Sequence, residues 1–281
     1  MAEPLRSGRA APQAQPARSL AERLAAAGVS AGDDPFATWT ALRAVEGRRT
    51  TVVDLYRLAA APLGILPQEL PQDRRADLAA RAMRVIWPGF EVTTGGERDT
   101  DPVSIVDYDP AWPRQFAEWR SRISAELGAS AVRIDHVGST AVPGLTAKPT
   151  IDVQVSVAAL DDEPAYAAGL ERIGLVLRSR DRLHRFFRPP PGQPRSVHVH
   201  VCAAGGAWER EHLLFRDHLR THPLARREYA AAKREAVETW GSDRVAYGEA
   251  KSDVILDQLS DAEGWAAQVG WAPGHGDTGA N

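Results

Sequence analysis

A single cysteine, Cys202, is the whole thiol content of this 281-residue chain. One cysteine excludes a disulfide framework and a cysteine-rich zinc site, and it is typical of a protein from a reducing compartment. Cys202 lies in the apolar run 197–204, so we expect an inert thiol in the core. No stretch approaches the apolar length needed to span a bilayer, and we therefore predict a cytoplasmic protein with no membrane partner.

The chain also lacks an excess of charge of either sign, with 25% charged residues and a formal net charge of −3. This balance argues against a basic nucleic-acid binder and against an acidic tail protein. A polyanion site must therefore be a local cluster of basic residues. Residues 1–18 lack the apolar centre of a secretory signal, so we expect a disordered leader, and the glycine-rich end, 271–281, predicts a flexible tail.

Residues 19–98 carry helical patterns punctuated by proline and glycine. Ser19 followed by Glu22 is a capping-box pattern, which predicts a helix start, and Gly28 predicts the end of that helix. The segment 93–96, Thr-Thr-Gly-Gly, is typical of a linker. We therefore predict a helical N-terminal domain or lid ending near residue 98, with further helices at 35–46, 51–61 and 72–87.

Residues 99–270 alternate between strand and helix patterns, which predicts a mixed sheet packed against helices in the α/β (α+β) class. The boundaries follow from the apolar periodicity and from proline and glycine turn signals. Strands are predicted at 103–106, 132–137, 150–157, 175–178, 183–188 and 196–202, and helices at 113–127, 163–173, 208–220, 224–239 and 247–267.

The sharpest feature is a strand followed by Gly138-Ser139 and then a second strand that carries Asp152. A Gly-Ser pair that opens a helix can hold phosphate on free backbone N–H groups. Strict alternation places Asp152 and Gln154 on one face of their strand, and His198 and His200 on one face of another. Carboxylates that point together from one face of a strand can hold Mg²⁺, which prefers oxygen ligands.

The string 136–145, His-Val-Gly-Ser-Thr-Ala-Val-Pro-Gly-Leu, and the string 147–153, Ala-Lys-Pro-Thr-Ile-Asp-Val, closely resemble the signature of the GrpB family. Further matching pieces are 198–201, 214–220, Pro223, Arg227, Tyr229, Lys233, Tyr247 and Lys251, so that the resemblance covers about residues 103–260. It implies a nucleotidyltransferase-like fold. Domains of this family also occur behind dephospho-CoA kinases, but the sequence contains no Gly-x-x-x-x-Gly-Lys-Ser/Thr loop.

One position departs from the polymerase-type transferases of this superfamily, which carry a carboxylate two residues after the first aspartate. Here that residue is Gln154, a poorer Mg²⁺ ligand, so an ordinary two-metal mechanism is insecure. We hypothesise a site formed by Asp152, His198 and His200 for a divalent metal, Mg²⁺ or Mn²⁺, or Zn, Fe or Ni if the histidines are ligands. Alternatively, one histidine is structural or acts as a general base.

Several residues are candidates for binding substrate. Arg185 and Arg188 have an odd spacing on a strand, so alternation directs only one of them inward, and a solvated strand edge is the alternative. Arg216 precedes Asp217, which can pair with Arg220 in a purely structural contact. Tyr247 and Lys251 share one helix face. The full set of candidates is Gly138, Ser139, Thr140, Lys148, Gln154, Arg185, Arg188, Arg216, Tyr247 and Lys251.

We therefore expect an enzyme that acts on a nucleotide or another phosphorylated small molecule with the assistance of a metal. Asp152, His198 and His200 are the expected catalytic residues. A non-catalytic nucleotide- or cofactor-binding module is the alternative, and Gln154 favours it. A third possibility is a different transfer or ligation chemistry on the same scaffold, with specificity supplied by residues 19–98.

Overall fold

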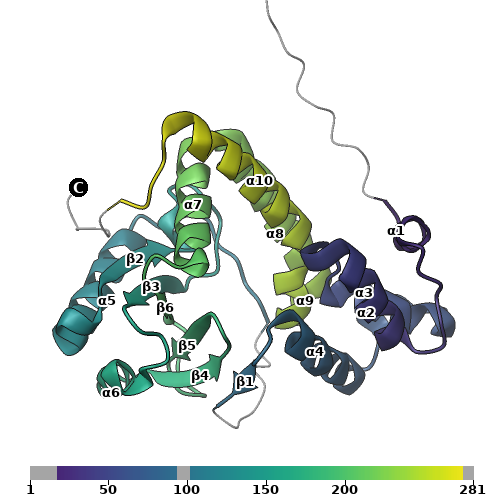
Figure 1. Ribbon diagram of the computed structural model, residues 1–281, viewed down its shortest axis with the longest axis horizontal. Coiled ribbons are helices and arrows are strands. Elements are labelled where there is room, and N and C mark those ends of the chain that lie inside the picture. The colour runs from purple at the N-terminus through teal and green to yellow at the C-terminus, as the bar shows by residue number, and fades with distance from the viewer. Residues whose placement is uncertain (1–17, 94–101, 275–281) are drawn as a thin grey trace, which may run out of the picture.

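The computed structural model describes residues 18–93 and 102–274. The predicted leader, the predicted domain boundary near residue 98 and the last part of the predicted tail lie outside these ranges. None of the helices in the two ranges combines the length and the apolar character needed to cross a bilayer. The described chain forms an N-terminal set of helices, a six-stranded sheet, and helices on both faces of that sheet (Figure 1).

The N-terminal helices lie where the sequence pattern predicts them, within two residues at each end. The first begins at the capping box of Ser19 and Glu22 and ends at Gly28, whose φ of 65° is the left-handed conformation that favours glycine. These helices are α1 (Leu20–Ala27), α2 (Pro35–Glu46), α3 (Val52–Ala60) and α4 (Gln72–Ile86).

The sheet has the strand order β1-β4-β5-β6-β3-β2, in which β3 and β6 are parallel and the other neighbours are antiparallel. This is the mixed sheet that the sequence predicts. Because β3 and β6 are neighbours and run in the same direction, their first residues lie side by side at the same end of the strands. The strands are β1 (Glu91–Val92), β2 (Arg133–Val137), β3 (Ile151–Val157), β4 (Val176–Arg180), β5 (His184–Arg188) and β6 (Val197–Ala203).

The structure differs from the prediction at both ends of the sheet. The predicted strand 103–106 makes only an isolated bridge between Val106 and Ala147. Residues 91–92, between the last predicted N-terminal helix and the predicted linker 93–96, form an edge strand, β1, against β4 that was not predicted. The sequence pattern does not predict β1, because two residues are too few to show the alternation of apolar and polar residues that marks a strand. Pairing with β4, and not the local sequence, defines this strand.

One face of the sheet is covered by α5 (Trp112–Leu127) and α6 (Ala167–Arg172). The alternation of β3 directs Val153 and Val155 to this face, where they pack with Phe116 and Ile123 of α5. The predicted helix 163–173 is divided, because Glu163–Ala165 forms a separate 3₁₀ turn. The polar face of the strands is therefore the opposite one.

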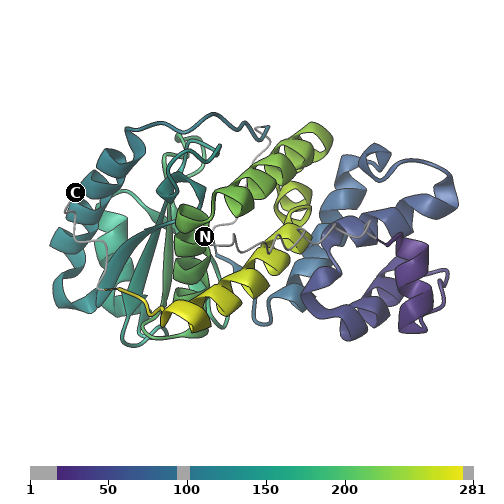
Figure 2. The same ribbon diagram turned by 90° about the horizontal axis from the view of Figure 1, so that it is seen from above.

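That opposite face is partly covered by α7 (Ala207–Thr221), which contacts β2 and β6. The chain continues through α8 (Pro223–Trp240), α9 (Arg244–Glu249) and α10 (Ser252–Val269). The single helix predicted at 247–267 is in fact α9 and α10, with a break at residues 250–251. Figure 2 shows α8 and α10 between the sheet and the N-terminal helices.

The N-terminal helices share a hydrophobic core with the C-terminal ones. Trp39 and Tyr56 pack in one cluster with Trp240 and Tyr247. The rings of Tyr56 and Trp240 are 5.9 Å apart. The site residues on α9 are therefore held partly by α3, although α3 lies far from them in the sequence.

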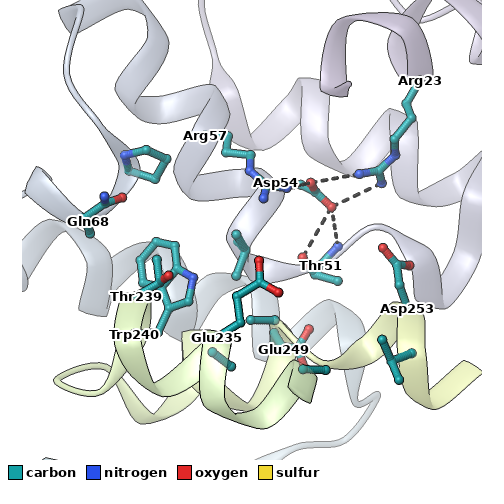
Figure 3. A pocket seen from close by; sticks show the side chains of 16 residues that line it. Arg23, Thr51, Asp54, Arg57, Gln68, Glu235, Thr239, Trp240, Glu249 and Asp253 are labelled. Atoms are coloured by element: carbon teal, nitrogen blue, oxygen red, sulfur yellow. Dashed lines mark hydrogen bonds and ion pairs between the residues drawn. The ribbon is translucent and has the colours of Figure 1, made fainter. Parts of the chain in front are cut away.

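A pocket of about 360 Å³ also lies between the two sets of helices (Figure 3). On one side Asp54 accepts hydrogen bonds from Arg23 and from the backbone of Thr51. Glu235 and Glu249 form the opposite wall. Because its carboxylates outnumber its arginines and Asp54 is fully paired, this pocket is an unsuitable site for a phosphorylated ligand.

Candidate functional site

Asp152, His198 and His200 converge at the start of the two parallel strands. Asp152 pairs with His198 in the β3–β6 register, and His200 lies two residues further along β6 on the same face. His198 Nδ1 is 3.1 Å from Asp152 Oδ1, and His200 Nε2 is 3.8 Å from the same oxygen. Their potential ligand atoms lie within 4.8 Å of one another, the only such group found among the described residues. We refer to these three residues as the triad.

The triad is enclosed but open to small ligands. The side chain of Asp152 keeps 27% of its exposure and that of His200 keeps 23%. Burial lowers the pKa of both His198 and His200, which favours neutral imidazole, although Asp152 opposes this effect. Burial alone would raise the pKa of Asp152, but its contacts with the two histidines outweigh that effect and lower it. A carboxylate beside two imidazoles is a set of donors that a divalent cation accepts.

Gly138 brings the backbone against this carboxylate. It follows β2 with a φ of 68°, and a Cβ added there would lie 2.4 Å from Asp152 Oδ2. Both the positive φ and the close approach require glycine. Residues Ser139–Ala141 form a 3₁₀ turn rather than the longer helix that the sequence suggests. The Gly-Ser turn therefore forms one wall beside the triad.

Replacing Gly138 with alanine will both destabilise the fold and displace the Asp152 carboxylate. We expect a loss of about 1–3 kcal/mol in the free energy of unfolding, from left-handed strain and from overpacking. Gly144→Ala is the matched control, because Gly144 has a φ of 77° but nothing within 4 Å of an added Cβ. Chemical denaturation and Mn²⁺ titration of both variants check this. Equal effects of the two substitutions would contradict the role of the close approach.

Three lysines form a cluster beside the triad, and they are the only lysines in the sequence, although lysine and arginine together number 34. Lys233 and Lys251 are buried, and Lys148 is half-buried. Lys233 donates to the carbonyl of Thr146. Lys251 donates to the carbonyl of Tyr247 at 2.6 Å.

The positive charges of the lysines lower one another's pKa values. The pKa values of Lys233 and Lys251 are lowered to about 7, mainly by burial and in part by the charge of Lys148, while Asp152 opposes the shift of Lys233. Burial also lowers the pKa of Lys148, again against the effect of Asp152. A cluster of cations held together against their own repulsion fits an anionic ligand.

Two tyrosines complete this wall, each four residues before a lysine. The ammonium of Lys233 lies 5.0 Å from the ring centre of Tyr229, and that of Lys251 lies 3.6 Å from the ring centre of Tyr247. Burial raises the pKa of Tyr229, and its hydrogen bond with Ser139 acts in the opposite direction. Burial raises the pKa of Tyr247 to about 12. Both tyrosines thus remain neutral, and Tyr229 contacts the Gly-Ser turn through Ser139.

Some predicted site residues have structural contacts instead. The hydroxyl of Thr140 bonds to His136 Nε2 at 3.0 Å and to the carbonyl of Thr150 at 3.4 Å. Arg185 points to the face opposite the triad, where Glu163 and Asp161 bind its guanidinium. Substrate roles for Thr140 and Arg185 stay predictions, but neither side chain lies with the triad.

The structure places the other two predicted arginines in different surroundings. Arg216 is buried, donates to Asp217 at 2.7 Å and to the carbonyl of His136 at 3.0 Å. Asp217 also lies 3.5 Å from Arg220, which is the structural pairing that the sequence suggests. Arg188 does lie on the same face of β5 as Phe186, but it lines a separate pocket beside α4.

Gln154 lies where the sequence predicts it, on the triad face and opposite His200 in the register. Its side chain is fully buried, and its amide forms no hydrogen bond with any described residue. Such a group is costly to bury unsatisfied. On this strand the chain therefore provides one carboxylate, that of Asp152, where the two-metal enzymes have two.

A column of rings that the sequence does not predict continues from the triad. His184 of β5 stacks on Trp208 of α7 with centroids 4.2 Å apart, and its centroid also lies 5.6 Å from that of His200. Asp181 orients His184 through a contact of 2.6 Å to Nδ1. Phe186 packs against both triad histidines at 5.0 and 5.1 Å. No local motif marks this column, since it assembles from β5, β6 and α7.

Fold and site together define an α+β protein whose mixed sheet presents an aspartate and two histidines at the start of adjacent parallel strands. A family model, described as GrpB protein, matches residues 102–261. The chain belongs to the GrpB family, as its signature predicts. The N-terminal helices α1–α4 lie outside the matched residues.

Individual relatives agree with this assignment. The UPF0157 protein SCO7215 of Streptomyces coelicolor is 44% identical over 154 residues, 55% of this chain and 81% of that protein. The dephospho-CoA kinase of Mycolicibacterium paratuberculosis is 34% identical over an alignment of 200 residues that covers 61% of this chain and 49% of the kinase. The crystal structure of GrpB from Enterococcus faecalis, 28% identical, covers 58% of this chain and 99% of its own with a TM-score of 0.52.

Proposed function

We propose that this GrpB-family protein is a metal-assisted enzyme that transfers a group to or from a nucleotide or another phosphorylated small molecule. The triad next to Gly138, together with the lysine cluster whose charges act on Asp152, supports this proposal most directly. Metal ligands beside cations are what phosphoryl and nucleotidyl transfer require, since such reactions depend on positioning and charge neutralisation.

The donor atoms fit a divalent cation. Asp152 through its carboxylate, His198 through Nδ1 and His200 through Nε2 would hold it. Two imidazoles favour Mn, Fe, Ni or Zn over Mg. The ion would supply charge neutralisation and polarisation of a phosphoryl oxygen. The proton that His198 shares with Asp152 would be displaced when the ion binds.

The protein side chains would bind and orient the phosphates. Lys148, Lys233 and Lys251 would neutralise phosphate oxygens, and Ser139 with Tyr229 would donate hydrogen bonds to them. The name of the mycobacterial relative, dephospho-CoA kinase, points to a nucleotide-like substrate for that protein. A nucleotide is therefore the first substrate class to test here.

Calorimetric titrations with ATP, CTP and CoA, each with and without Mn²⁺, test the proposal. We expect at least one nucleotide to bind more tightly when Mn²⁺ is present, and the mixture to release pyrophosphate or phosphate slowly even without an added acceptor. If nucleotides bind equally well with and without Mn²⁺, and no pyrophosphate or phosphate is released, the proposal is wrong.

Gln154 favours a second candidate, a nucleotide-binding module without catalysis. A neutral amide replaces the carboxylate that a second metal ion would need, and its buried position makes it part of the permanent structure. For this module we expect metal-independent binding and no product in the same titrations. Release of pyrophosphate would exclude it.

A further inference from the structure

A cavity of about 500 Å³ lies between the N-terminal helices and the GrpB-family region, beyond the ring column. Its walls come from α2, the end of α4, the β4–β5 turn, α7 and α10. The apolar part includes Trp87, Leu183, Trp208 and Ile255. Large apolar cavities with a few polar groups at domain junctions are the usual form of small-molecule sites.

The aromatic wall of the cavity continues directly to the triad. Trp208 lines the cavity and stacks on His184, and His184 in turn stacks on His200. The ring centres of Trp208 and His200 are 6.2 Å apart. A ligand packed on Trp208 is therefore separated from the metal-ligand residues by the width of one or two rings.

The edge ring Trp87 adds a second aromatic surface. It meets Trp208 edge to face, with centroids 6.0 Å apart. Two rings at this angle form a corner for a flat apolar or aromatic group.

The charges in the cavity are partly paired, and two of its arginines, Arg43 and the exposed Arg182, form no ion pair among the described residues. Arg48 is bound to Glu211 at 2.8 Å, and Asp181 is bound to His184 at 2.6 Å. Arg43 donates to the carbonyl of Thr50 and lies over the Trp39 ring; the carboxylate of Glu249, which also lines the cavity, acts on it without forming an ion pair among the described residues. A half-buried guanidinium with no anion in direct contact favours an anionic group on the ligand.

We propose that this cavity is a second ligand site, which takes a flat aromatic or apolar molecule carrying one anionic group. The aromatic part packs on Trp208 and Leu183, and the anion faces Arg43. Its place beside the triad makes it the site of the second substrate, an inference that rests on the function proposed above. The N-terminal helices then supply specificity, since α2 and α4 form the cavity only together with the family fold.

Fluorescence titration of the full chain with 1-anilinonaphthalene-8-sulfonate, a flat aromatic anion, tests the site. We expect one dye per chain. Leu183→Glu should weaken the dye about tenfold or more, because it brings a carboxylate against both the ring and the anion. Leu63→Glu is the matched control, since Leu63 and Leu183 are both 52% exposed and Leu63 lies outside the cavity. Equal weakening in both variants, or in neither, overturns the proposal.

The role of Arg43 is tested with a pair of dyes. Arg43→Gln should weaken the sulfonate dye about tenfold, in line with the loss of a charge-assisted contact, but should leave neutral N-phenyl-1-naphthylamine within about twofold. Thermal denaturation of the variant verifies that it is folded. If both dyes are weakened equally, the anionic half of the proposal is wrong.

Energy transfer from the bound dye to Co²⁺ at the triad tests the link between the two sites. Energy transfer to Co²⁺ is efficient only when the dye lies close to the ion. We therefore expect the dye fluorescence to be quenched in the wild type and not in Asp152→Asn, with dye affinity unchanged. Dye binding without quenching in the wild type would refute the neighbouring metal while the cavity stands. Loss of dye affinity in Asp152→Asn would show that the dye occupies the triad instead, which overturns the second site.

Discussion

Asp152→Asn will abolish Mn²⁺ binding while the protein stays folded. Asparagine has the same shape and can still accept the hydrogen bond that His198 Nδ1 donates at 3.1 Å, so the strands keep their contact. It lacks the negative charge that holds a cation between two neutral imidazoles. Since removal of supporting groups alone costs 10–100-fold in metal affinity, we expect a loss of more than about 100-fold for a direct ligand. Calorimetry and the electron paramagnetic resonance signal of free Mn²⁺ measure this loss.

A surface aspartate provides the control. Asp161→Asn removes a carboxylate whose side chain is 97% exposed and whose partner is Arg185, on the face of the sheet away from the triad. It should bind Mn²⁺ like the wild type. If Asp152→Asn retains wild-type affinity, the triad is not the metal site, and the proposed function loses its main support. Unfolding of Asp152→Asn would be visible by circular dichroism, and Asp152→Ser then repeats the test with a smaller side chain.

The sequence predicts the triad because period-two alternation fixes which strand residues share a face. Asp152 and the two histidines could be assigned to one face of their strands from residue spacing alone, and the GrpB-like signature predicted the fold. That β3 and β6 are parallel neighbours is a long-range pairing. The family resemblance, and not the local pattern, made their proximity predictable.

Lys233 and Trp208 were not predicted as site residues for different physical reasons. The segments 229–233 and 247–251 both have tyrosine followed four residues later by lysine, so the repeated pattern and the scarcity of lysine were available signals for Lys233. Trp208 carries no comparable signal, because its role depends on α7 crossing the sheet beside β5 and β6. Conversely, Arg185 and Thr140 had suitable chemistry, but partners that only the fold reveals already bind them.

Affinity for polyphosphate will fall as the pH rises through 7, because the ligand-binding charges are lost there. Lys233 and Lys251 have pKa values of about 7, below the ordinary value, so both are charged at pH 6 and largely neutral at pH 8.5. Each charged contact with phosphate is worth about 1.5–3 kcal/mol, so we expect inorganic tripolyphosphate to bind at least about tenfold more weakly at pH 8.5 than at pH 6. Calorimetry without metal measures this change.

Two observations separate this effect from the titration of the ligand. Tripolyphosphate gains negative charge as the pH rises, which alone would tighten its binding to cations. In the double variant Lys233→Met/Lys251→Met, the fall in affinity should disappear and the affinity at pH 6 should already be low. An unchanged pH profile in this variant would contradict the assignment of the two lysines. Acetylation mapped by mass spectrometry adds a direct readout, since tripolyphosphate should protect the three lysines together.

The same lysines make the stability of the fold change in the opposite direction. Their pKa values in the folded protein lie below the unfolded value of 10.5, so between pH 7 and 10.5 the unfolded chain binds more protons. The free energy of unfolding contributed by these groups therefore rises with pH across this window. We expect urea denaturation to show the wild type gaining stability from pH 7 to 9 while tripolyphosphate affinity falls, and the double variant showing neither change. As the pH falls and these lysines become charged, the fold loses stability while the affinity for the anionic ligand rises. These two opposite changes distinguish ligand-binding lysines from ordinary structural ones.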